Sequence, residues 1–139
     1  MADVIYNSFK AKIMDGSIDL DTDAIKVMLV GSAYTPDQDV HDFKNDITSE
    51  ITGSGYTAGG ATLAGTVSQD NTDNEGVFDA ADVTWATSTI TARGAVIYKD
   101  TGVGSTSPLI CYIDFGADKS SSAGNFTIQW NAEGIVNLG

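Results

Sequence analysis

The chain has 139 residues, of which 42% are hydrophobic and 19% are charged, and its formal net charge is −12. This composition excludes a disordered chain, and the length is that of one domain with its own core, spanning residues 1–139. The strongly negative charge repels phosphate backbones, so we expect no nucleic-acid partner; it suits docking onto a basic protein surface. No apolar run approaches the roughly 18 residues needed to cross a bilayer, so we expect no membrane partner.

The N-terminal segment, residues 1–16, is predicted to contain a short helix over about Ser8–Met14. Three apolar residues recur in it at intervals of four: Ile5, Phe9 and Ile13. That interval is helical, and Asp15 and Gly16 supply a stop. The segment lacks the long apolar region and the cleavage site of a signal peptide, so we expect synthesis in the cytosol without secretion by that route.

Residues 25–30, with the sequence IKVMLV, are predicted to form a strand whose two faces are both largely apolar. The polar and acidic region after this strand has apolar residues at intervals of three and four, at Val40, Phe43 and Ile47. We therefore expect one or two helical turns within Val40–Glu50, giving one or two short helices in the N-terminal part of the chain.

From Thr52 onward, the chain is predicted to consist of strands and turns. Strands are expected within six stretches: 61–69, 77–86, 90–100, 109–116, 126–131 and 134–138. A tight link is expected near Thr87 and Ser88, and a turn over residues 117–125. Short strands separated by turn clusters at this spacing predict an all-β fold, an antiparallel β-sandwich.

The predicted strands differ in how many apolar faces they have. In FTIQW, Phe126, Ile128 and Trp130 point inward while Thr127 and Gln129 face solvent, which is typical of a half-buried strand. The stretches GAVIYKD and LICYIDF instead carry apolar side chains on both faces. Their outer face therefore needs a cover, either from helices or loops of the same chain or from another subunit.

The residues that could support catalysis are few, and we predict no enzyme and no catalytic residues. His41 is the only histidine, and its neighbours Asp39 and Asp42 indicate a solvated surface position. Cys111 lies among apolar residues and is interpreted as a small buried hydrophobe. A glycosidase could use two carboxylates alone, for which Asp100 and Asp114 are candidates; the alternative is that each marks a strand end or pairs with a lysine.

Metal and cofactor sites are also not predicted. One cysteine and one histidine cannot complete a four-ligand zinc site. The stretch DLDTD places Asp19, Asp21 and Asp23 at alternate positions, but an EF-hand loop would need glycine and glutamate where Ala24 and Val30 stand. The acidic stretches DQDVHD and DNTDNE could supply oxygen ligands, as acidic loops in any such chain could.

Arg93 is the only arginine, and it lies in ITARGAVIYKD, the most apolar strand-like stretch of the chain. A catalytic role would need a nucleophile, a base or a phosphate-binding loop beside it, and no such motif is present. We therefore predict a structural role, in which the planar guanidinium makes a bidentate pair with a carboxylate. The partner could lie in the same chain or across an interface.

Three stretches carry a resemblance to a known family: VIYNSFKAKIMDGSIDLDTDAIKVMLV, TARGAVIYKDTG and GNFTIQWNAEGIVNL. With them the chain resembles small structural proteins of tailed bacteriophages, in particular capsid decoration (cement) proteins. The resemblance implies a jelly-roll-like sandwich located in the virion, on the capsid surface, with the major capsid protein as partner. The strands with two apolar faces leave surface to cover, so we also expect a homo-oligomer.

An apolar chain end adds a hypothesis about the interface with the shell. The N-terminal segment would become ordered on binding, with Val4, Ile5, Tyr6 and Phe9 as anchors and Arg93 as a further interface candidate. Two alternatives remain open at this point. One is a tail or neck component of the virion, and the other is a carbohydrate-binding module that uses Trp85 or Trp130 as a stacking surface.

Overall fold

The computed structural model describes residues 3–139, so the first two residues of the predicted segment 1–16 lie outside it. Antiparallel strands make up most of the regular structure in these residues, with one α-helix and two short 3-10 helices. The elements in chain order are β1 (Val4–Ile5), α1 (Asn7–Met14), β2 (Ile25–Val30), η1 (Lys44–Asp46), β3 (Ala61–Thr62), β4 (Gly65–Asp70), β5 (Glu75–Ala80), β6 (Val83–Ser88), β7 (Thr91–Lys99), η2 (Gly104–Thr106), β8 (Leu109–Ser120), β9 (Gly124–Ile128) and β10 (Val136–Leu138).

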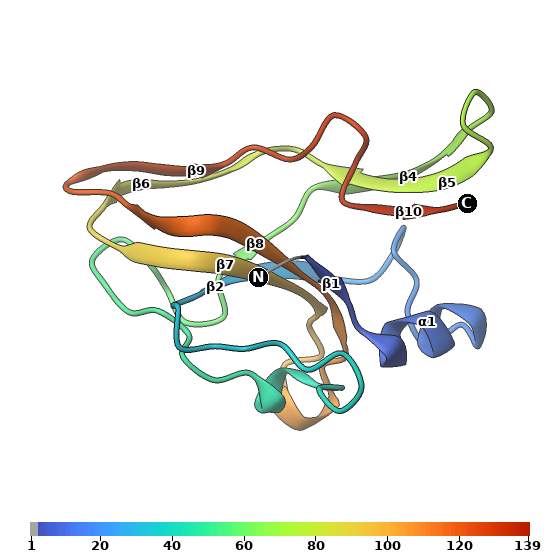
Figure 1. Cartoon of the computed structure of the whole chain (residues 1–139), viewed down its shortest axis with the longest axis horizontal. Coiled ribbons are helices and arrows are strands. Elements are labelled where there is room, and N and C mark those ends of the chain that lie inside the picture. The colour runs from blue at the N-terminus through green and yellow to red at the C-terminus, as the bar shows by residue number, and fades with distance from the viewer. Residues whose placement is uncertain (1–2) are drawn as a thin grey trace.

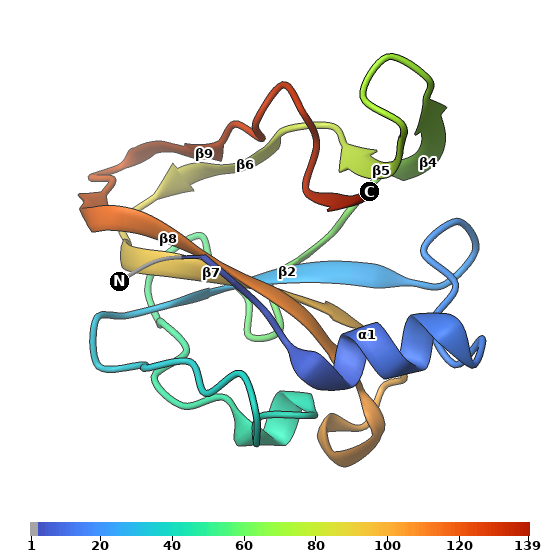
Figure 2. The same ribbon diagram turned by 45° about the vertical axis from the view of Figure 1, so that its right-hand side comes forward.

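The strands form two layers (Figures 1 and 2). The first layer is a five-stranded sheet with the order β1-β8-β7-β2-β3. The second layer consists of two smaller sheets, β10-β5-β4 and β6-β9, which lie above opposite ends of the first. Every strand pairing is antiparallel. The predicted all-β, sandwich-like fold is confirmed, whereas the jelly-roll connectivity stays a prediction.

The two layers are joined where the β7–β8 pair folds back into the β6–β9 pair (Figure 1). Ser88 is fully buried at this corner, with Oγ 2.9 Å from the carbonyl oxygen of Trp85, 3.1 Å from that of Gly124 and 2.7 Å from Ser121 Oγ. The hydroxyl thus satisfies carbonyl groups that have no partner in the strand ladder where the chain changes direction. The predicted link at Thr87 and Ser88 was therefore slightly misplaced, because both residues belong to β6.

Two predicted single strands are each divided in the structure. The stretch 61–69 contains β3 and β4, which belong to different layers. The stretch 77–86 contains parts of β5 and β6, separated at Ala81 and Asp82. There the indole Nε1 of Trp130 donates to Ala81 O at 2.9 Å, and the Trp130 backbone N–H donates to Asp82 Oδ1 at 3.1 Å. These contacts hold the chain at the break between the two small sheets. The turn predicted over 117–125 is also shorter, since β8 extends to Ser120.

The core between the layers confirms the predicted inward-facing residues. Phe126, Ile128 and Trp130 are 6%, 6% and 9% exposed, and Trp85 is 7% exposed. Phe9 of α1 joins the same apolar cluster. The α-helix begins one residue before the predicted Ser8, and the only helical turn within Val40–Glu50 is η1.

The opposite face of the five-stranded sheet has a second apolar cluster of its own. Its buried members are Tyr6, Met28, Val30, Tyr34, Val96, Tyr98, Leu109 and Tyr112. The connection from β2 to β3, residues 31–60, runs along this side of the sheet and includes η1 (Figure 1). The cover that the two-faced strands require therefore comes from the same chain, so a second subunit is not needed for it.

The close approach of this connection to β2 depends on Gly60. Gly60 has φ +80, and a Cβ there would overlap the carbonyl oxygen of Val27. We expect Gly60→Ala to lower the free energy of unfolding by more than about 2 kcal/mol, because the left-handed backbone and the overlap both penalise the side chain. Chemical denaturation would measure it. Gly76→Ala is the control, since a Cβ there meets nothing within 4 Å; equal effects of both substitutions would contradict the expectation.

Candidate functional site

The residues proposed as N-terminal anchors are mostly internal. Tyr6 is 0% exposed and Phe9 is 1% exposed, so each packs inside its own chain and neither is free to anchor a partner. Val4 and Ile5 are half-buried and pair with Tyr112 and Cys111 in the ladder between β1 and β8. For Tyr6 and Phe9 the interface hypothesis was wrong. The apolar character that suggested it reflects the two core clusters, one on each face of the sheet.

Arg93 has its carboxylate partners in the same chain, at an irregular point of the β7–β8 ladder. Ala92 pairs with Lys119 and Gly94 pairs with Asp114, so residues 115–118 of β8 bulge out opposite Arg93. Arg93 Nε lies 3.4 Å from Asp114 Oδ1, and Nη1 lies 3.9 Å from Asp118 Oδ1. The predicted bidentate pair with one carboxylate was therefore wrong. The guanidinium instead joins the two ends of the bulge.

Asp114 is nearly buried, with 3% of its side chain exposed. Its Oδ1 accepts the backbone N–H of Gly116 at 3.0 Å, and this hydrogen bond, with the Arg93 guanidinium, holds the pKa of the Asp114 carboxyl below its usual value. Asp100 accepts the N–H of Gly102 at 3.0 Å and lies 3.6 Å from Lys26 Nζ. Asp114 pairs with Gly94 in the β7–β8 ladder, and Gly94 precedes Asp100 by six residues along the chain. Because a strand rises about 3.3 Å for each residue, the two carboxyls are roughly 20 Å apart. A glycosidase pair would need about 5–9.5 Å.

His41 is more enclosed than predicted. Its ring stacks on Tyr34 with a centroid distance of 5.6 Å, and its Nδ1 accepts the N–H of Asp37 at 3.1 Å. The Tyr34 hydroxyl lies 2.9 Å from the same nitrogen and 2.7 Å from the Tyr6 hydroxyl. Because Nδ1 accepts from Asp37, Tyr34 donates to it and Tyr6 donates to Tyr34. Burial raises the pKa of Tyr34 to about 12 and raises that of Tyr6 further. These hydrogen bonds therefore connect the N-terminal segment, through Tyr6, to the connection between β2 and β3, through Tyr34 and His41.

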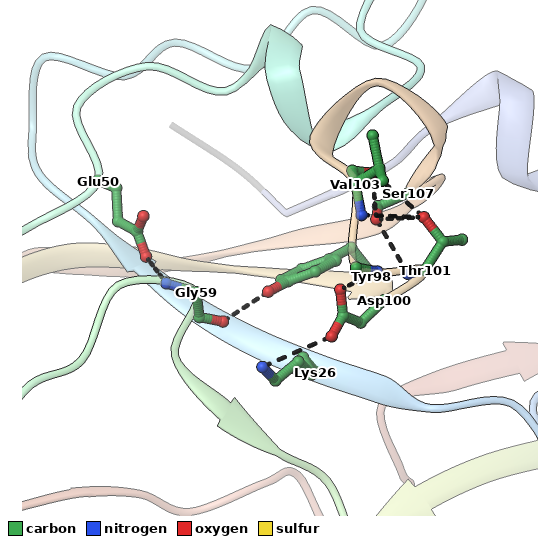
Figure 3. Close-up of polar contacts among 9 residues, drawn as sticks. Lys26, Glu50, Gly59, Tyr98, Asp100, Thr101, Val103 and Ser107 are labelled. Atoms are coloured by element: carbon green, nitrogen blue, oxygen red, sulfur yellow. Dashed lines mark hydrogen bonds and ion pairs between the residues drawn. The ribbon is translucent and has the colours of Figure 1, made fainter.

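A second set of polar contacts closes the cover near its end (Figure 3). Glu50 Oε2 accepts the N–H of Gly59 and the hydroxyl of Tyr56, both at 2.7 Å. Tyr98, on β7, donates its hydroxyl to Gly59 O at 2.6 Å. Burial raises the pKa of Tyr98, so the hydroxyl stays a donor. These groups satisfy the backbone of a loop that has no strand partner at this point.

Cys111 is buried, as predicted, and burial raises the pKa of its thiol to about 12. A protonated thiol of this kind is a poor nucleophile. The two tryptophans are buried in the core, so neither presents a flat surface to a sugar.

The carboxylates of DLDTD are engaged with the backbone. Asp19 Oδ1 accepts the N–H of Asp21 at 3.0 Å and that of Thr22 at 3.3 Å, while Asp23 Oδ2 accepts the N–H of Asp19 and pairs with Lys99. Among residues 3–139, one acidic group could hold a hard cation: the ligand oxygens of Asp70, Asp73 and Glu75 lie within 4.8 Å of one another. Exposed acidic turns of this kind are common in acidic chains, and Asp70 already caps its own turn.

A lateral cleft between the layers was not foreseen from the sequence. It consists of two adjoining hollows of about 340 and 450 Å³ that share Phe115, Ile128 and Gln129 in their walls. One end is lined by Lys119, and the other end by Asp3 and Glu133. The cleft lies between the outer edge of β8 and that of β9, and its existence depends on long-range packing that no local pattern reveals.

No family model, no curated protein and no solved structure matches this chain. Within residues 3–139, no helix has the length and the apolar character needed to span a membrane.

The geometry of the Arg93 ion pairs predicts that they contribute little to the free energy of unfolding. Its contacts are long and 32% of its side chain is exposed, so water screens the attraction. We expect Arg93→Lys to lower the free energy of unfolding by less than about 1 kcal/mol. Urea denaturation monitored by tryptophan fluorescence would measure the change. A loss above about 2 kcal/mol would show that the guanidinium is essential to the bulge.

Asp46 is expected to make the stability of the connection 31–60 depend on pH. Its Oδ2 accepts the N–H of Asp42 at 2.8 Å and that of Phe43 at 3.0 Å, and these hydrogen bonds lower the pKa of the carboxyl below 3.8. The resulting stabilisation is present above the unfolded pKa and is lost as the pH falls through the lower folded pKa. We expect Asp46→Ala to cost about 1–2 kcal/mol at neutral pH and progressively less below about pH 4. Thermal melts across pH would test this, with the exposed Asp21→Ala as control. A cost independent of pH would contradict it.

Proposed function

We propose that this chain is a structural protein of a tailed-phage virion, a capsid decoration (cement) protein that binds the outer surface of the head through the major capsid protein. The resemblance of the three stretches noted above supports this proposal. The catalytic candidates, in the described residues, are engaged in internal contacts, which suits a binding protein. A tail or neck component is the alternative that the localisation experiment below distinguishes.

The observation that carries the proposal is the absence of cationic side chains from the second layer. The second layer and its connections, residues 65–88 and 124–138, contain no lysine or arginine. They contain six acidic residues: Asp70, Asp73, Glu75, Asp79, Asp82 and Glu133. All seven cationic side chains lie elsewhere, on α1, the first sheet and its connections. The negative charge of this layer is therefore not compensated within it, whereas the rest of the chain has thirteen acidic and seven cationic residues. We refer to the second layer as the acidic face, and its charge would be attracted to a basic protein lattice.

Binding of this kind would stabilise a head by mass action. A protein that binds only the assembled lattice stabilises it by RT ln(1 + [L]/Kd), about 2.7 kcal/mol for each site at 100 times Kd. Because its described residues are already folded, the chain would lose little backbone entropy on binding.

The acidic face gives the proposal a mutational test. We expect Asp73→Lys/Asp79→Lys to weaken binding to purified undecorated heads by about 10-fold or more at low salt, because two attractive charges become repulsive. The wild-type affinity should also fall as salt rises. Co-sedimentation with heads would measure both. The control is Asp37→Lys/Asp39→Lys, which makes the same change of charge at two exposed residues of the connection 31–60, on the opposite face of the first sheet, and should bind nearly as the wild type does.

Localisation separates the remaining alternatives. Immuno-electron microscopy of the virion should label the head at many positions, with hundreds of copies for each particle. Labelling at a single vertex in few copies would indicate a tail or neck protein. The proposal would also fail if both double variants bound heads equally well.

A further inference from the structure

Strand β9 is an edge strand without the usual protection against pairing. Its only partner among residues 3–139 is β6, so its other side is unpaired. Edge strands normally carry charges, proline or bulges, or are very short. The stretch 120–132, which includes β9, contains no charged residue and no proline in a chain with a net charge of −12. Among the other outer strands of the two layers, β1, β3 and β10 are two or three residues long, β4 ends at the acidic turn, and β6 is interrupted by a bulge between Trp85 and Ser88.

The backbone groups of β9 that face the open side can be assigned from three contacts. Gly124 O accepts from Ser88 on β6, and Trp130 N–H donates to Asp82 next to β6. Thr127 Oγ1 lies 2.9 Å from Thr84 Oγ1, as in a pair whose backbone groups point away from each other. Because these groups alternate along a strand, the N–H and C=O of Asn125, Thr127 and Gln129 point to the open edge.

From this edge we infer that two copies of the chain associate by antiparallel pairing of β9 with β9, about a two-fold axis at Thr127. The pairing would match Thr127 with Thr127 and Asn125 with Gln129, in hydrogen-bonded pairs with no buried charge. Phe126 and Ile128 would keep their places in each core, since alternate side chains face inward.

The charges at the two ends of the lateral cleft favour a second copy as the occupant. Lys119 lies at one end, and Asp3 and Glu133 lie at the other. A two-fold axis at Thr127 reverses the direction of the second cleft and so brings its acidic end toward the lysine of the first. Each copy then places its acidic end beside the lysine of the other copy, as expected for a self-complementary isologous interface. The inference concerns self-association alone and does not depend on the proposed virion role.

Sedimentation velocity at rising protein concentration would test the inference. The wild type should sediment as a dimer in the micromolar range. Thr127→Lys should weaken dimerisation by about 10-fold or more, since it places two ammonium groups against each other at the axis. Thr84→Lys is the matched control: Thr84 is the exposed cross-strand neighbour of Thr127 on β6, away from the open edge, and this variant should dimerise normally. Thermal melts would confirm that both variants are folded.

Two further measurements fix the register. Thr127→Lys mixed with Thr127→Asp should restore the dimer, because opposite charges then meet at the axis. Thr127→Cys should form a disulfide-linked dimer on mild oxidation, because Cα atoms in such a pair are about 5.5 Å apart, within disulfide range; Thr84→Cys should not. A wild type that stays monomeric, a Thr127→Lys chain that still dimerises, or a mixture that stays monomeric would overturn the inference.

Discussion

The burial of β7 on both faces is the constraint on which the rest of the structure depends. Five consecutive residues of this strand, 94–98, are buried, and the neighbouring β2 is buried nearly throughout. A sheet with two apolar faces needs two covers, and the chain supplies both. The second layer covers one face, and residues 31–60 cover the other. The latter connection is held by bridges of Glu50 to Val30 and of Phe43 to Pro108.

The two covers are built by different means, which explains where the polar residues lie. A sheet satisfies its own backbone groups, whereas a connection without regular structure needs side chains to do so. Within its strands the second layer therefore needs only alternating apolar residues, and side chains satisfy its backbone only at the corner near Ser88 and at the break near Asp82. In the cover formed by residues 31–60, Tyr98, Glu50 and Asp46 hold the backbone through hydrogen bonds. The hydrogen bonds from Tyr6 to Tyr34 and from Tyr34 to His41 connect this cover to the N-terminal segment. His41, the one histidine of the chain, is thus engaged in keeping this cover closed.

The features that the sequence predicted well are those set by local periodicity. The alternation in FTIQW identified its inward residues, IKVMLV was predicted as a strand with two largely apolar faces, and the four-residue interval identified α1. The features it missed depend on register between distant strands. Nothing local shows that 61–69 and 77–86 divide between sheets, or that Arg93 stands opposite a bulge with Asp114 and Asp118 at its ends. Likewise, large apolar residues such as Tyr6 and Phe9 are expected both at an interface and in a core. Only the packing of the folded chain shows that these two belong to the core.

Because both faces of the first sheet are covered internally, the two surfaces to which we assign partners are the second layer and the lateral edge at β9. They differ in chemistry: the first is acidic, while the second is uncharged along the strand with opposite charges at its ends. Like-charged acidic faces would not pair with each other, but uncharged edges can. Pairing through β9 would leave the acidic faces of both copies uncovered. A lattice of basic sites could then engage two faces at once, which raises avidity without any new contact.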